Sequence, residues 1–118
     1  MDYSLFCRVV REELSSDVSF LGNNHKEIVQ KISNQQFSNI FSWLKRIVSQ
    51  EIRALHPKRG QQYKGVPTNE LLVFRYALNI EGVAYRVLLV KIKNEFFWEF
   101  HLGKHDYYDD VRKKLSLK

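Results

Sequence analysis

The sequence contains only one cysteine, Cys7, among its 118 residues. A single cysteine excludes an internal disulfide bond and a metal site built from several thiolates. No apolar run approaches the roughly 20 residues that a membrane-spanning helix needs. The first residues, MDYSLFCRVVREE, also lack the basic start and long apolar stretch of a signal peptide. We therefore expect a cytoplasmic protein that does not enter a membrane.

Proline and glycine are also scarce, with two prolines and five glycines in the chain. Both prolines and two of the glycines fall in residues 56–70, HPKRGQQYKGVPTNE, which predicts one long loop. Hydrophobic residues make up 44% of the chain, which is enough for a core and too many for a disordered protein. A length of 118 residues then predicts a single domain over residues 1–118.

Acidic residues are outnumbered, and the formal net charge is +6. Most of the excess lies in residues 45–64, which carry six basic side chains and one acidic side chain. Such a cluster is compatible with a solvated helix face or with a surface that binds a polyanion. Because the charge is concentrated in one short segment, we favour the second interpretation, with nucleic acid as the simplest polyanion.

Hydrophobic periodicity predicts three elements before the loop. Alternation over residues 3–10 predicts a strand. Asn24 with Glu27 resembles a capping box, which predicts the start of a short helix. A stripe of apolar residues at steps of three and four predicts a longer helix, capped by Asn34 and ended by Pro57. The stripe consists of Phe37, Ile40, Phe41, Leu44, Ile47, Val48, Ile52 and Leu55.

Three strands are predicted after the loop, and they cover residues 71–80, 84–92 and 95–102. Short turns at residues 81–82 and 93–95 join them, so neighbouring strands should be antiparallel. The middle strand is apolar on both sides, which predicts a central position in the sheet.

A short helix is predicted last, over residues 107–115, with Asp106 as N-cap and Asp109 and Asp110 in its first turn. Together the elements predict an α+β fold. An N-terminal strand and a helical hairpin should pack on a three- to four-stranded antiparallel sheet that leads into the C-terminal helix. The helical stripe should cover one face of the sheet and leave the other face partly open.

Two arginines interrupt the apolar strands, Arg75 on the first and Arg86 on the middle one. A charged side chain in such a strand needs solvent or a partner. The arginines either lie on an exposed face of the sheet, with Glu99 as a candidate partner, or bind an anionic substrate. We favour the first interpretation for Arg75, and both stay open for Arg86.

Gly103 ends the third predicted strand, and Lys104 and His105 follow directly. A histidine here can be a surface residue, a helix cap or a general acid or base, because its unperturbed pKa is about 6.5. His101 and His105 have the spacing of two metal ligands on one helix. Because Gly103 and the strand before it interrupt any helix between them, no zinc site is predicted.

Three motifs occur in an order that points to a known family: YKGV at residues 63–66, AYRVLLV at 84–90 and LGKHDYYDDV at 102–111. In this order they resemble the C-terminal half of the RelE/ParE superfamily of bacterial type II toxins. The HigB-like branch is the most similar, because its last strand runs into a G-x-H-x-x-Y-D signature, here residues 103–109. The resemblance covers about residues 58–112, and residues 1–56 match only in the order of their elements.

The resemblance implies a RelE-like domain that cleaves mRNA, often on the ribosome, without a metal or another cofactor. A ribose 2′-hydroxyl would attack the adjacent phosphate. His105 would act as acid or base, Arg86 would stabilise the phosphate, and Tyr108 would hold the substrate or assist proton transfer. Candidate contacts to RNA and its phosphates are Lys45, Arg46, Lys58, Arg59, Lys64, Arg75, Lys91 and Lys104. The resemblance also implies a cognate antitoxin as partner, typically a helix-turn-helix protein.

The sequence departs from the family pattern in two respects. Many RelE-type members have arginine at the position of His105. Five acidic residues lie in the C-terminal part, and several carboxylates near a site would repel phosphate: Glu95, Glu99, Asp106, Asp109 and Asp110. Two other functions therefore stay open, a ParE-like inhibitor that binds gyrase and a phage protein that binds a host complex.

Overall fold

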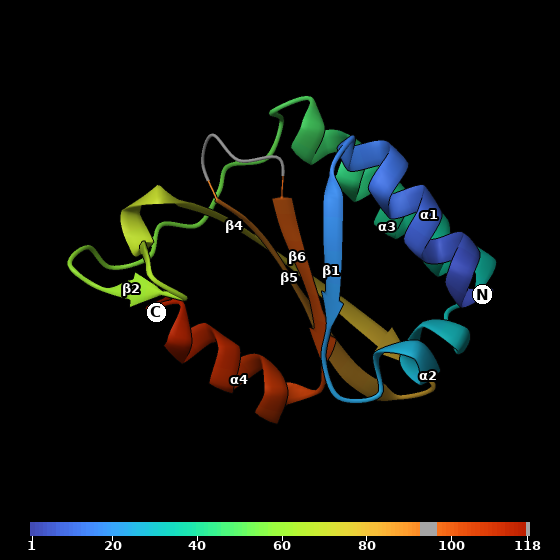
Figure 1. Cartoon of the computed structure of the whole chain (residues 1–118). Helices are drawn as coiled ribbons and strands as arrows, with labels where there is room; N and C mark the ends of the chain where they lie inside the picture. The colour runs from blue at the N-terminus through green and yellow to red at the C-terminus, as the bar shows by residue number, and fades with distance from the viewer. Residues whose placement is uncertain (93–96, 118) are drawn as a thin grey trace.

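The computed structural model describes residues 1–92 and 97–117. Its centre is a sheet whose strands are β1 (Asp17–Leu21), β4 (Leu71–Ile80), β5 (Val83–Ile92) and β6 (Phe97–Gly103). The four strands lie in the order β1-β6-β5-β4 (Figure 1). The predicted turn at residues 93–95, with Phe96, lies outside the described residues.

The three predicted C-terminal strands are confirmed, and β5 has the predicted central position. β4 and β5 form an antiparallel hairpin whose turn residues, Glu81 and Gly82, have φ angles of 52° and 81°. These positive angles are typical of a tight hairpin turn. β5 and β6 are also antiparallel, but β1 pairs with β6 in parallel. The sheet is therefore mixed, whereas the sequence predicted an antiparallel one.

The strand predicted at residues 3–10 is wrong, because this segment lies in helix α1 (Tyr3–Leu14). The Asp2 side chain caps the helix by accepting a hydrogen bond from the backbone N–H of Leu5, at 2.7 Å. The buried residues of α1 follow helical spacing: Phe6, Cys7, Val10 and Leu14. The N-terminal strand exists, but it is β1, which follows this helix.

The two predicted helices of the N-terminal half are confirmed as α2 (His25–Gln30) and α3 (Asn34–Val48), but their caps differ. The Asn24 side chain makes no capping hydrogen bond. The cap of α3 is Ser33, which forms a capping box with Gln36.

Helix α3 also ends earlier than predicted. The chain turns at Gln50, whose φ is 62°, so the last two residues of the apolar stripe lie beyond the helix. Both residues, Ile52 and Leu55, are half-buried. Ile52 packs against the core, and the Leu55 N–H donates to the Val73 carbonyl of β4 at 2.7 Å. The apolar periodicity therefore correctly predicted that these two residues pack inward, but it wrongly predicted that they belong to the helix.

The predicted loop contains short regular elements. Strands β2 (Gln62–Tyr63) and β3 (Val66–Pro67) form a two-stranded hairpin, and a 3₁₀ helix, η1 (Thr68–Glu70), follows. Lys64 and Gly65 form the turn of this hairpin, with φ angles of 50° and 80°. The hairpin brings Tyr63 against the sheet, where it is buried.

The predicted C-terminal helix is confirmed as α4 (His105–Lys114), which begins two residues earlier than expected. Lys104 occupies the N-cap position, and Asp106 lies in the first turn instead of capping it. The helices α1, α2 and α3 cover one face of the sheet, and α4 with the β2-β3 hairpin lies over the other (Figure 1). The second face was expected to stay partly open, but α4 packs on it and forms a second apolar core. This core includes Leu88, Val90, Val111 and Leu115.

The α+β class is thus confirmed. Among the described residues, no helix combines the length and the apolar character needed to cross a membrane.

Candidate functional site

The face of the sheet beneath α4 carries the two arginines that interrupt the strands. Alternate residues of a strand point to opposite faces of a sheet. On β5, Leu88 packs in the core beneath α4, so Arg86, two residues earlier, points to the same face. On β4, Val73 packs there too, and Arg75 follows it two residues later. The arginines therefore share the α4 side of the sheet.

Tyr108 joins Arg75 to the start of α4. Arg75 Nη1 donates to the Tyr108 hydroxyl at 2.7 Å, and the ring of His105 lies with its centroid 6.4 Å from that of Tyr108. Tyr108 is buried in the core beneath α4, whereas His105 is exposed at the first residue of the helix. The phenol is thus fixed by packing, and the imidazole stays accessible.

Arg86 lies beside this group on the adjacent strand. It is opposite Ala77 of β4 and Gly103 of β6 in the strand register. Arg75 is therefore the diagonal cross-strand neighbour of Arg86 on the same face. The Cα atoms of such neighbours are typically roughly 7–8 Å apart. The structure thus brings Arg75, Arg86, His105 and Tyr108, which we call the His105 cluster, to one side of the sheet.

The lysines and arginines that were predicted to contact RNA lie on both sides of the sheet. Lys104 precedes α4 directly, and the Lys58 N–H donates to the Ser116 carbonyl just beyond α4, so Lys58 and the adjacent Arg59 belong to the α4 side. Three others lie on the opposite side. Lys91 covers the Trp98 ring there at 5.4 Å, and Lys45 and Arg46 are exposed on α3. These three are therefore not part of the His105 cluster.

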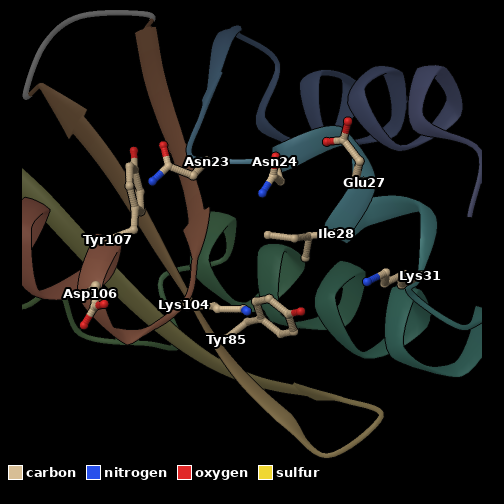
Figure 2. A pocket seen from close by; sticks show the side chains of 9 residues that line it. All are labelled: Asn23, Asn24, Glu27, Ile28, Lys31, Tyr85, Lys104, Asp106 and Tyr107. Carbon is tan, nitrogen blue, oxygen red and sulfur yellow. The ribbon is translucent and has the colours of Figure 1, made fainter.

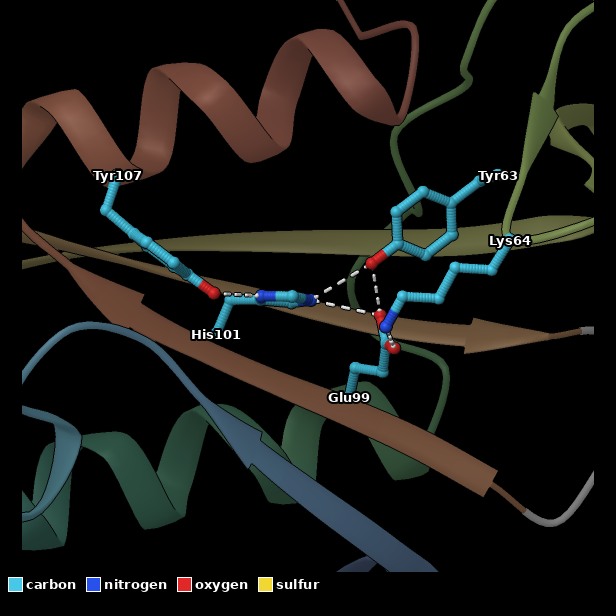
Figure 3. A network of polar contacts seen from close by, with 5 residues as sticks. All are labelled: Tyr63, Lys64, Glu99, His101 and Tyr107. Carbon is cyan, nitrogen blue, oxygen red and sulfur yellow. Dashed lines mark hydrogen bonds and ion pairs between the residues drawn. The ribbon is translucent and has the colours of Figure 1, made fainter.

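A second polar group on the α4 side was missed by the sequence analysis (Figure 3). We call it the Glu99 network: Tyr63, Lys64, Glu99, His101 and Tyr107. Glu99 Oε1 accepts from the Tyr63 hydroxyl at 2.6 Å and lies 3.0 Å from His101 Nε2. Lys64 pairs with Oε2 of the same carboxylate, and His101 Nδ1 lies 2.7 Å from the Tyr107 hydroxyl.

The network is almost fully buried at its centre, where Glu99 is 5% and His101 4% exposed. Burial alone would raise the pKa of Glu99, but hydrogen bonds from His101, Lys64 and Tyr63 outweigh it and lower the pKa to about 2. Glu99 is therefore ionised at neutral pH. Lys64, predicted as a phosphate contact, instead balances this carboxylate, and neither Arg75 nor Arg86 pairs with it.

The bonds of the network assign the proton positions on His101. An ionised carboxylate only accepts hydrogen bonds, so Nε2 of His101 carries a hydrogen that it donates to Glu99. His101 Nδ1 lies 2.7 Å from the Tyr107 hydroxyl, which can donate to it. We therefore assign a neutral ring whose Nδ1 accepts from the Tyr107 hydroxyl. The order Tyr107–His101–Glu99 is then that of a hydroxyl, a base and an orienting carboxylate.

Tyr107 holds its place because the residue beneath it is glycine. A Cβ atom at position 103 would lie 2.7 to 2.9 Å from atoms of the Tyr107 side chain, which is too close for ordinary contact. Burial raises the pKa of Tyr107 to about 12, and the carboxylates of Glu99 and Asp110 act in the same direction. The phenol is therefore protonated at neutral pH.

Tyr107 also borders two open pockets. One has a volume of about 450 Å³ and is lined by Asn23, Asn24, Glu27, Ile28, Lys31, Tyr85, Lys104, Asp106 and Tyr107 (Figure 2). The other, of about 560 Å³, has Tyr63, Lys64, His101 and Tyr107 in its wall. A substrate at the start of α4 can therefore reach the Tyr107 side chain from either pocket.

The acidic residues of α4 are largely compensated within the helix. Asp109 pairs with Arg112 and Lys113, and Asp110 pairs with Lys114. These ion pairs reduce the repulsion that the carboxylates would otherwise exert on a phosphate.

Sequence alternation carried part of the signal for the Glu99 network. Glu99 and His101 are two residues apart on a strand, on the parity opposite to Trp98, Phe100 and Leu102, so they had to share the other face. Their partners could not be found in this way, because Tyr63 and Lys64 come from a hairpin 35 to 38 residues earlier in the chain.

When the chain was compared with protein-family models, with curated proteins and with solved structures, none of them matched it.

Proposed function

We propose that this protein is an endoribonuclease toxin of a type II toxin–antitoxin pair that cleaves mRNA without a metal ion. Two lines of reasoning support the proposal. The order and spacing of the three sequence motifs resemble HigB-like toxins, as described above. The observation that carries most weight is the His105 cluster, in which an exposed imidazole lies beside a phenol that accepts from Arg75, with Arg86 on the adjacent strand of the same face.

This set of groups suits the transfer of a phosphate from one ribose oxygen to another. The 2′-hydroxyl attacks the adjacent phosphate, and negative charge builds up on the phosphate oxygens in the transition state. Guanidinium groups stabilise such charge with directed hydrogen bonds, and Arg86 with Arg75 fills this role. An accessible imidazole can give or take a proton during the reaction, and His105 fills this role.

The proposal is tested by incubating the purified protein with mRNA, both free and bound to ribosomes, in the presence of a metal chelator. We expect products with 2′,3′-cyclic phosphate and 5′-hydroxyl ends. His105→Gln and Arg86→Gln should each lower the cleavage rate by roughly 10²-fold or more. Arg8→Gln is the matched control, because Arg8 is exposed on α1 at the opposite side of the sheet. Full cleavage by both cluster variants would refute the assigned site.

The partner that we propose is an antitoxin. An apolar groove of about 350 Å³ lies on the α3 side of the sheet, and its lining includes Ile47, Val48, Phe74 and Trp98. This groove is the proposed docking area, and Val48 is exposed at its edge. The product of a neighbouring reading frame should bind the wild-type protein and relieve growth arrest. Val48→Glu should weaken that binding and leave RNA cleavage intact.

A further inference from the structure

Tyr107 lies between the buried Glu99 network and the open pockets. Its hydroxyl is bonded to His101, while the Tyr107 side chain borders both pockets. His101 and Glu99 are 4% and 5% exposed, and the Tyr107 hydroxyl occupies the contact to His101 Nδ1, so a substrate the size of a nucleotide does not touch that nitrogen directly. A proton that moves between a bound substrate and His101 Nδ1 therefore passes through the Tyr107 hydroxyl.

We infer that Tyr107 takes the proton from the attacking 2′-hydroxyl, with His101 as the final acceptor of the relay. Glu99 is a positioning residue, because it holds the His101 ring and balances the charge that forms on it. This inference rests on the proposed ribonuclease function and deepens it by separating the base from the acid. Tyr107 occupies a variable position of the G-x-H-x-x-Y-D signature, whose tyrosine is Tyr108.

The relay keeps protons and electron pairs balanced. The 2′-hydroxyl gives its proton to the phenolic oxygen of Tyr107 while the phenolic proton moves to His101 Nδ1. The 2′-oxygen forms a bond to phosphorus, and the bond from phosphorus to the 5′-oxygen breaks. The 5′-oxygen takes a proton from the His105 imidazolium. His101 ends as an imidazolium beside the Glu99 carboxylate, and it returns its proton to solvent through Tyr107.

The placement of the two proton-transfer groups fits this division of roles. Tyr107 and His105 are two residues apart on α4, so their side chains leave the helix about 200° apart, on opposite flanks of the same end. Attack and departure occur on opposite sides of phosphorus in an in-line displacement. Lys104, the N-cap residue of α4, lies at the same end of the helix and borders a pocket with Tyr107.

The neutral state assigned to His101 supports the same direction of transfer. Its Nδ1 accepts from the Tyr107 hydroxyl, so the imidazole is ready to receive the phenolic proton. Because Tyr107 gains one proton as it loses another, no free phenoxide needs to form. The relay therefore works with a phenol that remains protonated at neutral pH.

The test compares two RNAs that differ in one atom, the 5′-oxygen of the scissile bond or a sulfur in its place. Sulfur leaves as a thiolate without needing a proton, so the modified RNA needs the base but not the acid. Single-turnover cleavage is measured with both RNAs, free and bound to ribosomes. Tyr107→Phe should lower the rate roughly 10²- to 10³-fold on both RNAs with little change in KM. His105→Gln should lower it on the oxygen RNA and far less on the sulfur RNA.

Tyr76→Phe is the matched control, since it removes a phenolic hydroxyl on the opposite side of the sheet, where Tyr76 packs on Trp43. Glu99→Gln adds a readout that a purely structural role would not change. Without the carboxylate, the imidazolium loses its counter-charge, and the acidic limb of the pH–rate profile should move to lower pH. Circular dichroism of each variant ensures that rates are compared between folded proteins.

Each outcome separates the relay from the proposed function. If the wild type cleaves RNA and folded Tyr107→Phe cleaves both RNAs at the wild-type rate, the relay is refuted and the ribonuclease proposal stands. The relay is also refuted if Tyr107→Phe behaves like His105→Gln and recovers on the sulfur RNA. If the folded wild type cleaves neither free nor ribosome-bound RNA, the proposed function itself fails and the relay with it.

Discussion

Protonation of Glu99 should account for a defined part of the acid sensitivity of the fold. In the folded protein Glu99 is 5% exposed and accepts from Tyr63, His101 and Lys64, and its pKa is about 2, against 4.5 for a free glutamate. Below pH 4.5 the unfolded chain therefore binds more protons than the folded one. The stabilisation is complete above about pH 4.5 and is lost as the pH falls towards 2.

The size of the effect follows from the two pKa values. A difference of about 2.5 pKa units corresponds to about 3.4 kcal/mol when the titration is complete. Between pH 7 and pH 3 the folded carboxylate is still mostly ionised while the unfolded one is mostly protonated. The free energy of unfolding should therefore fall by about 2 kcal/mol over this range through Glu99 alone.

Urea titrations at pH 7, 5, 4 and 3 measure this loss when wild type is compared with Glu99→Gln. The variant keeps the size of the side chain and removes its titration, so other groups cancel in the difference. The difference in unfolding free energy should shrink by about 2 kcal/mol from pH 7 to pH 3. Tyr63→Phe removes one of the three donors to Glu99. The difference in unfolding free energy between wild type and this variant should therefore decrease less over the same pH range. A difference that stays constant across this range would refute the assignment of Glu99 as a buried, ionised centre.

Three further predictions concern other parts of the fold. Burial lowers the pKa of His25 to about 4, so stability should fall by about 2 kcal/mol from pH 7 to pH 5, where the unfolded state takes up the proton. His25→Phe should abolish this loss in urea titrations, since the ring lies among Tyr3, Phe20 and Phe100. Gly103→Ala should displace Tyr107 and lower RNA cleavage as Tyr107→Phe does, whereas cleavage at the wild-type rate would contradict that contact. Ser33→Ala should lower the free energy of unfolding by about 1 kcal/mol, because α3 loses its N-cap. An unchanged melting temperature would contradict the stabilising role of this cap.

The sequence predicted best those elements whose signals are local. The strands β4 and β6 were marked by alternation, β5 by a run that is apolar on both sides, and α4 by the acidic residues at its start. The segment at residues 3–10 was ambiguous, because its apolar residues fit both alternation and a helical face. The helix is stabilised by the Asp2 cap and by packing of Phe6 and Val10 against the core. This tertiary packing cannot be predicted from the sequence of the segment alone.

The candidate site divides in the same way. His105, Arg86 and Tyr108 lie within the motifs, and the core beneath α4 shows that Arg75 and Arg86 share one face of the sheet. The Glu99 network depends on the β2-β3 hairpin, which brings Tyr63 and Lys64 to a strand far along the chain. Lys91, which the resemblance implied as a phosphate contact, lies on the other face of β5, where it covers the Trp98 ring.

The most direct test of the account is the chemistry of the RNA ends that the purified wild-type protein produces in the presence of a chelator. Mass spectrometry should find 2′,3′-cyclic phosphates paired with 5′-hydroxyl ends, and both should vanish together in the double variant Tyr107→Phe, His105→Gln. Intact mRNA after incubation with the folded wild-type protein, with and without ribosomes, would contradict the account.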